Sequence, residues 1–250
     1  MDVRRVLTEL PTRVEREPVV GAGMGGDDTT AIDAAAERVV LAHFERLDDA
    51  TIVSEEAGIV GDGRTHVVID PIDGSLNAKR GIGFFSLSIA VASGPTMGDV
   101  EFGFVHDFGT GEEWTATIGR GAWLNGHQLK GQLPRETIEI LSFEATRTAL
   151  VAEKAAAMVD LAYRLRIMGS LALSLCHLAA GRVDGVCSLK PARAVDIAAA
   201  QLLVHERGLA IDLPDAQPFA AAPLDVEGRS RVVAAGTPEL CQQLAAALSA

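Results

Sequence analysis

A buried-type segment that ends in two acidic residues constrains the fold of this chain more than any other feature. Residues 67–81 read VVIDPIDGSLNAKRG, and the aliphatic residues at the start predict a short strand. Pro71 and Gly74 predict a turn that stops the strand. The strand would deliver Asp70 to a sheet edge, and the turn would bring Asp73 close to it. Alone, this pattern is equally typical of a turn in which an aspartate hydrogen-bonds its own backbone.

A second strand that ends in acids favours a metal site over a simple turn. Residues 50–58, ATIVSEEAG, contain a short apolar strand that leads into Glu55 and Glu56. If the acids of both strands gather at one sheet edge, their like charges cannot all stay ionised without a cation. Ligands that are all oxygens suit Mg²⁺, Mn²⁺ or Ca²⁺ rather than Zn²⁺. We therefore expect a site for a hard divalent cation at this edge.

The residues that follow the first acidic pair predict an anion site beside the metal. Gly74 and Ser75 resemble the start of a helix whose free backbone N–H groups could hold an anion. An acidic metal site next to such an anion site indicates phosphate chemistry. A further aspartate, Asp196, begins an apolar helix within residues 192–208. From that stretch alone, its expected role is to stabilise the N-terminus of the helix.

Composition argues against several classes of partner. The chain has 250 residues and a formal net charge of −12, which argues against nucleic acid or an anionic membrane as the main partner. An anionic substrate would need local neutralisation, for which a metal ion is the obvious candidate. The three cysteines show no CxxC spacing, so we expect small buried residues rather than disulfides or a zinc site. No segment matches a signal peptide or the roughly 20 apolar residues of a membrane span, so we expect a cytoplasmic protein.

Periodicity along the chain predicts a mixed sheet with helices packed against it. Helical spacing covers 29–47, 149–162, 170–180 and 195–206, the last closed by Gly208, and a final helix opens at Thr237 and Pro238. Strand-like segments lie at 84–94, within 100–126, at 182–189 and around 232–236. Residues 212–230 contain three prolines and predict a loop rather than a domain boundary.

Six motifs, taken in order, carry a resemblance to one known family. They are GDDTTAID (26–33), SEEAG (54–58), DPIDGSLN (70–77), GAWLNG (121–126), MGSLALSLCHLAAGRVDG (168–185) and VDIAAAQLLVHERG (195–208). Their succession resembles that of the inositol monophosphatase family of magnesium-dependent phosphatases. The NAKRGI that follows the third motif, and RAVD at the start of the last helix, look more like the archaeal-type branch, which hydrolyses both inositol monophosphate and fructose 1,6-bisphosphate.

The resemblance implies a fold and an assembly. The fold would be an α+β sandwich of five αβαβα layers, in which mixed sheets alternate with layers of helices. Residues 1–250 would form a single domain, with an α+β half at 1–130 that carries most metal ligands and an α/β half at 131–250. Because the family commonly forms dimers, a homodimer is implied as well.

The resemblance also assigns roles to individual residues. The metal ligands would be Glu55, Asp70, the Ile72 carbonyl, Asp73 and Asp196, which would hold two or three Mg²⁺ ions, with Mn²⁺ as an alternative. Asp33 and Ser75 would polarise the water that attacks phosphorus, and Glu56 is a further catalytic candidate. The substrate would contact Gly74, Ser75, Gly169, Ser170 and Arg193.

Two departures from the family's usual pattern bear on chemistry and substrate. Ser75 replaces the usual threonine but keeps the hydroxyl, so the chemistry should survive with a looser rotamer. Residues 185–195 lack the acid with which many inositol-preferring members hold sugar hydroxyls, and contain Lys190 and Arg193 instead. Their charges favour a substrate with a second phosphate or a carboxylate. Lys190 is equally well explained as a solvated surface residue.

One function is favoured among several that fit. It is a Mg²⁺-dependent phosphomonoesterase that acts on a small phosphorylated metabolite, namely inositol 1-phosphate, fructose 1,6-bisphosphate or both. The alternatives are a phosphatase for histidinol phosphate or adenosine 3′,5′-bisphosphate, and a non-catalytic regulatory relative. Two residues separate Asp70 from Asp73, whereas the haloacid-dehalogenase pattern has one, so the spacing favours attack by water over an aspartyl-phosphate intermediate. Whether Lys79 or Arg80 reaches substrate stays open.

Overall fold

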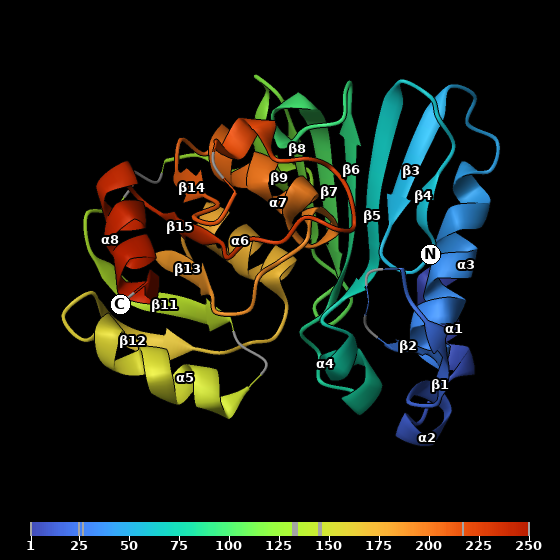
Figure 1. The fold of residues 1–250 in the computed structure, drawn as a ribbon, viewed down its shortest axis with the longest axis horizontal. Coiled ribbons are helices and arrows are strands. Elements are labelled where there is room, and N and C mark those ends of the chain that lie inside the picture. Colours follow the sequence, from blue (N-terminus) through green and yellow to red (C-terminus); the bar gives the residue numbers. More distant parts are fainter. Residues whose placement is uncertain are drawn as a thin grey trace.

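Two β-sheets alternate with three layers of helices in the computed structural model, which describes residues 2–24, 26, 28–131, 135–144, 147–216 and 218–249 (Figure 1). One outer layer contains α1 (Asp2–Glu9), α2 (Arg13–Arg16) and α3 (Ala31–Phe44). The middle layer contains α6 (Leu171–Ala179) and α7 (Ala194–Glu206), and the other outer layer contains α5 (Thr148–Ala155) and α8 (Pro238–Ser249). The predicted five-layer αβαβα sandwich is confirmed.

The larger sheet has eight strands and is mostly antiparallel. Its spatial order is β10 (His127–Gln128), β9 (Gly121–Leu124), β8 (Glu113–Thr117), β7 (Val100–Asp107), β6 (Ser86–Ala92), β5 (Thr65–Asp73), β3 (Ala50–Ser54) and β4 (Gly58–Val60). Among these, β3 and β5 are the parallel pair. The short helix α4 (Ser75–Arg80) follows β5 directly.

The smaller sheet has five strands in the order β12 (Ala162–Arg166), β11 (Ile138–Glu144), β13 (Gly185–Ser188), β15 (Val233–Ala235) and β14 (Ala210–Asp212). A separate hairpin near the N-terminus pairs β1 (Val19–Ala22) with β2 (Asp28–Thr30). The strands of the two large sheets thus come from successive stretches of the chain. The division into halves at residues 130 and 131 stays a prediction.

Helix α7 is apolar on almost all sides because it lies between the two sheets (Figure 1). It belongs to the hydrophobic cluster that also contains α6 and the inner face of the larger sheet. The helix ends as its sequence predicts. Gly208 has φ +68°, and the Gly208 and Leu209 N–H groups donate to the His205 and Val204 carbonyls, which is a Schellman cap.

Two local predictions were wrong. The predicted helix 149–162 is helical only as α5 and a 3₁₀ turn that ends at Met158, and β12 begins at Ala162. Asp160, at φ +70°, lies in the connection where the chain leaves the helical path and turns into a strand beside β11. The predicted helix 29–47 likewise starts later, at Ala31, because the preceding residues pair in β2.

The third correction concerns Pro71, which does not stop the strand. Strand β5 continues to Asp73, and its pairing with β6 moves from Asp70–Ser88 to Asp73–Ser86. Pro71 and Ile72 therefore oppose a single residue, so they form a β-bulge, a position that tolerates a proline without its N–H. The rest of the sequence-derived pattern holds, including the start of α8 at Pro238. No helix among the described residues is long and apolar enough to cross a membrane.

The contact between β7 and α7 yields a stability prediction. A Cβ atom built on Gly103 would lie 2.4 Å from the Ala199 carbonyl oxygen, whereas one built on Gly21 meets nothing within 4 Å. We expect Gly103→Ala to lower the free energy of unfolding by about 1–3 kcal/mol through overpacking, and Gly21→Ala to leave it nearly unchanged. Chemical denaturation of both variants checks this. Equal midpoints for the two would contradict a tight contact at Gly103.

Candidate active site

The parallel pairing of β3 with β5 brings two acidic residues to one edge of the larger sheet. Ser54 at the end of β3 pairs with Ile69 of β5, so the residues that follow, Glu55 and Asp70, leave the paired region side by side. Most residues of both strands are buried, which limits their movement. The sequence-based expectation that the two strand ends meet is therefore met in the structure.

The bulge in β5 holds Asp70 and Asp73 in different ways. The Ile72 N–H donates to Asp70 Oδ1 at 3.0 Å, which is the backbone contact expected of an aspartate in a turn. Asp73 Oδ2 instead accepts hydrogen bonds from Ser170 Oγ at 2.5 Å and from the Ala172 N–H at 2.8 Å, at the start of α6. Asp73 thus joins the end of β5 to the middle helix layer.

The first turn of α7 contributes an acid and a base to the same place. Asp196 Oδ2 accepts the Arg193 N–H at 2.8 Å, so this aspartate does stabilise its helix N-terminus. Its other oxygen, Oδ1, lies 3.1 Å from Arg193 Nη2. The same guanidinium nitrogen also contacts Glu55 Oε1. Arg193, expected to contact substrate, therefore bridges two of the expected metal ligands in this structure.

These groups line one cavity of about 340 Å³. It brings together most of the residues singled out from the sequence, namely Glu55, Asp70, Ile72, Asp73, Gly74, Ser75, Gly169, Arg193 and Asp196. Ser170 is not among its lining residues but holds Asp73 from behind. Asp33 and Glu56 lie in a small adjoining pocket that shares Glu55, Ile72 and Ser75 with the cavity.

The cavity carries an excess of negative charge in a largely buried environment. Burial raises the pKa of Asp70 well above its usual range, and the neighbouring charges of Glu55 and Asp73 add to the rise. Burial likewise raises the pKa of Glu55 and of Asp73, each to about 7. A cation that binds among such carboxyl groups stabilises their ionised forms.

The donor set fits a hard divalent cation. The side chains of Glu55, Asp70 and Asp196 and the Ile72 carbonyl offer only oxygen atoms to the cavity, and carboxylate and carbonyl oxygens are the preferred ligands of Mg²⁺ and Mn²⁺. Within the described residues, no three acidic, histidine or cysteine side chains are already arranged around a single ion position.

The adjoining pocket orients Asp33. Asp33 Oδ2 accepts hydrogen bonds from the Thr30 N–H and hydroxyl, at 3.2 Å and 2.5 Å, and Lys79 Nζ lies 3.2 Å away. The other oxygen, Asp33 Oδ1, is buried and has no hydrogen-bond partner in the described part of the chain. Ser75 Oγ donates to the Ile72 carbonyl at 3.0 Å. A buried acceptor thus remains open beside the cavity.

Two glycines let separate loops meet at the cavity. Gly74, at φ +90°, begins α4, and a Cβ atom there would lie 3.0 Å from the Gly169 carbonyl oxygen. Gly169 itself has φ +89°, and a Cβ atom there would lie 3.0 Å from Asn77 Nδ2. Only glycine combines this backbone conformation with such close contact. The two loops expected to hold substrate are therefore packed directly against each other.

Sequence reasoning missed two residues that support these loops. Asn77 Nδ2 donates to the Phe84 carbonyl at 2.8 Å and to the Met168 carbonyl at 2.7 Å. Glu144, buried at the end of β11, accepts the Gly169 N–H at 2.7 Å and the Ser174 hydroxyl at 2.9 Å. Asn77 is the last residue of the motif DPIDGSLN (70–77), which by itself indicates no role for it. Glu144 had no local signal, since its partners are distant in sequence.

Sequence reasoning also gave no role to Arg229, which lines the cavity together with Lys190. Arg229 comes from the loop predicted for 212–230. Arg80, whose role was left open, points elsewhere and donates to Glu17 Oε1 at 2.8 Å. Three cationic side chains, Lys190, Arg193 and Arg229, thus accompany the acids on the cavity wall.

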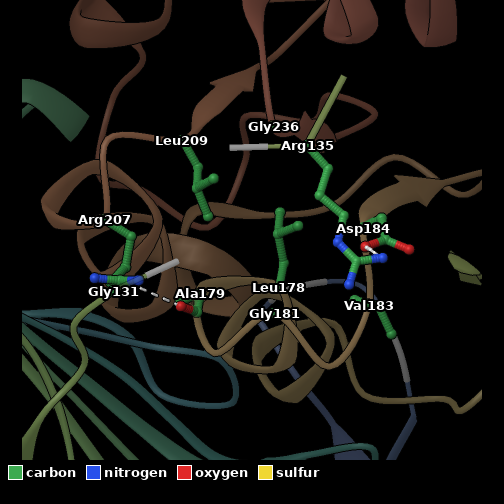
Figure 2. A pocket seen from close by; sticks show the side chains of 10 residues that line it. All are labelled: Gly131, Arg135, Leu178, Ala179, Gly181, Val183, Asp184, Arg207, Leu209 and Gly236. Atoms are coloured by element: carbon green, nitrogen blue, oxygen red, sulfur yellow. Dashed lines mark hydrogen bonds and ion pairs between the residues drawn. The ribbon is translucent and has the colours of Figure 1, made fainter. Parts of the chain in front are cut away.

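A second cavity, of about 250 Å³, is lined in part by the end of α6 (Figure 2) and shares no lining residue with the acidic cavity. Its charged groups are engaged in structural contacts. Arg135 lies 3.1 Å from Asp184, and Arg207 donates to the Ala179 and Leu129 carbonyls. These contacts hold loops together, so the acidic cavity is the better candidate for chemistry.

Comparison with known proteins identifies the family. The model of the inositol monophosphatase family matches residues 5–250. A fructose-1,6-bisphosphatase/inositol-1-monophosphatase of Archaeoglobus fulgidus is 32% identical over 240 residues, which cover 94% of this chain and 89% of that protein. Nus factor SuhB of Pasteurella multocida is 37% identical over 191 residues, which cover 73% of this chain and 70% of that protein.

A solved structure agrees with these matches. The crystal structure of an inositol monophosphatase-fructose 1,6-bisphosphatase superimposes with a TM-score of 0.83 at 29% identity, covering 98% of this chain and 95% of the other. The chain belongs to the inositol monophosphatase family, and the resemblance on which the sequence analysis relied is confirmed. Its class, a phosphatase, follows from the family.

The raised carboxyl pKa values predict how stability depends on pH. A raised native pKa stabilises the fold below the unfolded-state pKa, and this contribution is lost as the pH rises through the native pKa. In EDTA, we therefore expect the stability of Asp70→Asn relative to wild type to rise with pH from about pH 4, the pKa of an aspartate in the unfolded chain, until the pH passes the raised native pKa of Asp70, because the amide never ionises.

Thermal unfolding of both proteins across this range measures the difference. The half-buried histidines titrate in both proteins and cancel in the comparison. A constant difference in melting temperature would show that the Asp70 pKa is not raised. In wild type, added Mg²⁺ should restore stability most strongly at the alkaline end, because the ligands must ionise to bind it.

Proposed function

We propose that this chain is a Mg²⁺-dependent phosphomonoesterase that hydrolyses a small sugar or inositol phosphate. The observation that carries the proposal is the meeting of Glu55, Asp70 and Asp196 on one cavity that is also lined by Gly74 and Ser75. An acidic, oxygen-only wall suits the cation, and the adjacent loop suits a phosphate. Relatives named fructose-1,6-bisphosphatase/inositol-1-monophosphatase support the substrate class.

Bound Mg²⁺ would supply a Lewis acid that lowers the pKa of water and offsets charge on the leaving oxygen. Glu55, Asp70, Asp73, Asp196 and the Ile72 carbonyl would hold the ions, two or three in number. The count, and a role for Mn²⁺, stay predictions.

The side chains around the ions would prepare the reaction. Asp33 Oδ1 is the buried acceptor that would take a proton from the attacking water, and Ser75 lines both the small pocket of Asp33 and the cavity. Glu56 lies in the same pocket as a further acid. Gly74 and Gly169 would place the phosphate, because their loops are locked together. Asp70 and Asp73 are both held by hydrogen bonds from the protein. This suits direct attack by water better than attack by an aspartate.

The cations on the cavity wall support a substrate with a second anionic group. Lys190 and Arg229 lie on the same wall as Arg193, and basic groups of this kind hold phosphate or carboxylate. Fructose 1,6-bisphosphate has that second group and inositol 1-phosphate lacks it. Histidinol phosphate and adenosine 3′,5′-bisphosphate remain alternative substrates. Cytoplasmic location and the homodimer also stay predictions.

A regulatory role is the second candidate, because several relatives carry the name Nus factor SuhB. The acidic residues assigned to metal are all present on the cavity here, which favours catalysis. The two candidates differ in whether phosphate is released.

The test is phosphate release from fructose 1,6-bisphosphate and from inositol 1-phosphate, with Mg²⁺ and with EDTA. We expect Mg²⁺-dependent turnover that is faster with the bisphosphate. Asp70→Asn should lower the rate of phosphate release about 100-fold or more. Changing a residue that only supports a metal ligand already lowers metal affinity or activity roughly 10–100-fold. Asp62→Asn, at an exposed loop position, is the matched control and should keep wild-type activity.

Each outcome has a distinct meaning. Retained activity in Asp70→Asn would refute the assigned centre. Preference for inositol phosphate would remove Lys190 and Arg229 from substrate binding. Release from neither compound would direct the assay to the alternative phosphates, and release from none of them would leave the regulatory role.

A further inference from the structure

Lys79 is a largely buried cation for which neither the motifs nor the family comparison supplies a role. Its ammonium lies 3.2 Å from Asp33 Oδ2, and the two side chains are 16% and 8% exposed. It does not line the large cavity or the small pocket beside it. Lys79 therefore contacts Asp33 without lining either space.

The contacts of Asp33 are divided unequally between its two oxygens. Oδ2 takes all the partners, namely the Thr30 N–H, the Thr30 hydroxyl and the Lys79 ammonium. Oδ1 is buried without a hydrogen-bond partner in the described residues, and Asp33 lines the small pocket with Glu55, Glu56 and Ser75. A carboxylate with this division of contacts keeps one oxygen fixed and presents the other.

The position of Lys79 is set by the scaffold of α4 and not by Asp33 alone. Arg16 Nη1 donates to the Ala78 carbonyl at 2.7 Å, and Asn77 Nδ2 ties the helix to the Met168 carbonyl at 2.7 Å. Contacts from Arg16 and Met168, which are distant in sequence, thus hold α4 in place around Lys79. The Arg80 side chain is half-exposed, pairs with Glu17 on the outer side and takes no part in these contacts.

The charges around Asp33 make a fixed cation useful. Glu56 lines the same small pocket as Asp33, and its N–H donates to Glu37 Oε1 at 3.2 Å. Glu37, which also accepts the Ser54 hydroxyl at 2.5 Å, therefore belongs to the same group of acids. Without Lys79, Asp33 would face two other carboxylates with no ammonium beside it.

We propose that Lys79 is a positioning residue that holds Asp33 so that Oδ1 faces the reacting water. The inference rests on the proposed hydrolysis. Lys79 touches neither substrate nor metal in this role and acts through Asp33 alone. It explains why, among the described residues, Oδ2 has three partners while the buried Oδ1 has none.

The test compares Lys79→Met, Lys79→Arg and the matched control Arg80→Met, which removes the next cation on the same helix. We expect Lys79→Met to lower kcat about tenfold or more with KM changed less than twofold, because a misplaced catalytic group costs rate rather than binding. Lys79→Arg should recover most of kcat, and Arg80→Met should resemble wild type.

A double-mutant cycle with Asp33→Asn isolates the pathway. If Lys79 acts through Asp33, Lys79→Met should cause almost no further loss in the Asp33→Asn background. A crystal structure of Lys79→Met should show the Asp33 carboxylate rotated or in two orientations. A general loss of stability would not produce these results. Thermal unfolding of each variant measures stability separately.

Several results would overturn the inference. They are an effect on KM alone, additive losses in the cycle, an unmoved Asp33 carboxylate with reduced kcat, and a Lys79→Met variant as active as Arg80→Met. In all of these the wild type turns over substrate, so the proposed function stands. A wild type that releases no phosphate from any candidate overturns the proposed function first and this inference with it.

Discussion

Repulsion between buried carboxylates is the constraint on which this structure depends. Glu55 follows β3, Asp70 and Asp73 belong to β5 and Asp196 belongs to α7, yet all four line one largely buried cavity, and burial raises the pKa of the first three. The fold must supply rigid supports that oppose this repulsion. Strand ends, a helix start and the Arg193 guanidinium do so here, and the resulting acidic wall is the feature that suits a divalent cation.

The supports that oppose this repulsion lie in both sheets and in the helix layer between them. The parallel pair β3 and β5 fixes two acids, the bulge at Pro71 turns the third toward α6, and α7 carries the fourth. The strands and helices that support the site pack in two hydrophobic clusters, so the position of the acids depends on packing in both. Glu144 and Asn77 lock the loops that connect the layers.

Sequence patterns identified the acids but not the contacts between distant segments. Short apolar strands followed by acids gave Glu55 and Asp70, and ordered motifs gave the family and the five layers. The continuation of β5 through Pro71 was missed because a bulge depends on the register of β6, which no local pattern encodes. The roles of Glu144 and Arg229 and the contact of Lys79 with Asp33 were missed because tertiary packing brings these residues to the site. Strand β12 was missed, and the preceding helix was predicted too long, because α5 ends at a turn without glycine or proline.

The close contact between Gly103 and α7 limits which substitutions the chain can accept in evolution. Strand β7 carries no residue of the proposed centre, yet a larger side chain at Gly103 would press on the backbone of α7 at Ala199, one turn beyond Asp196. Asp196 and Arg193 lie on that helix and would move together with it. Gly103 does not line the cavity, yet the substitutions it can accept are thus limited by the position of the acids. Selection on the acids therefore extends to this part of the apolar core.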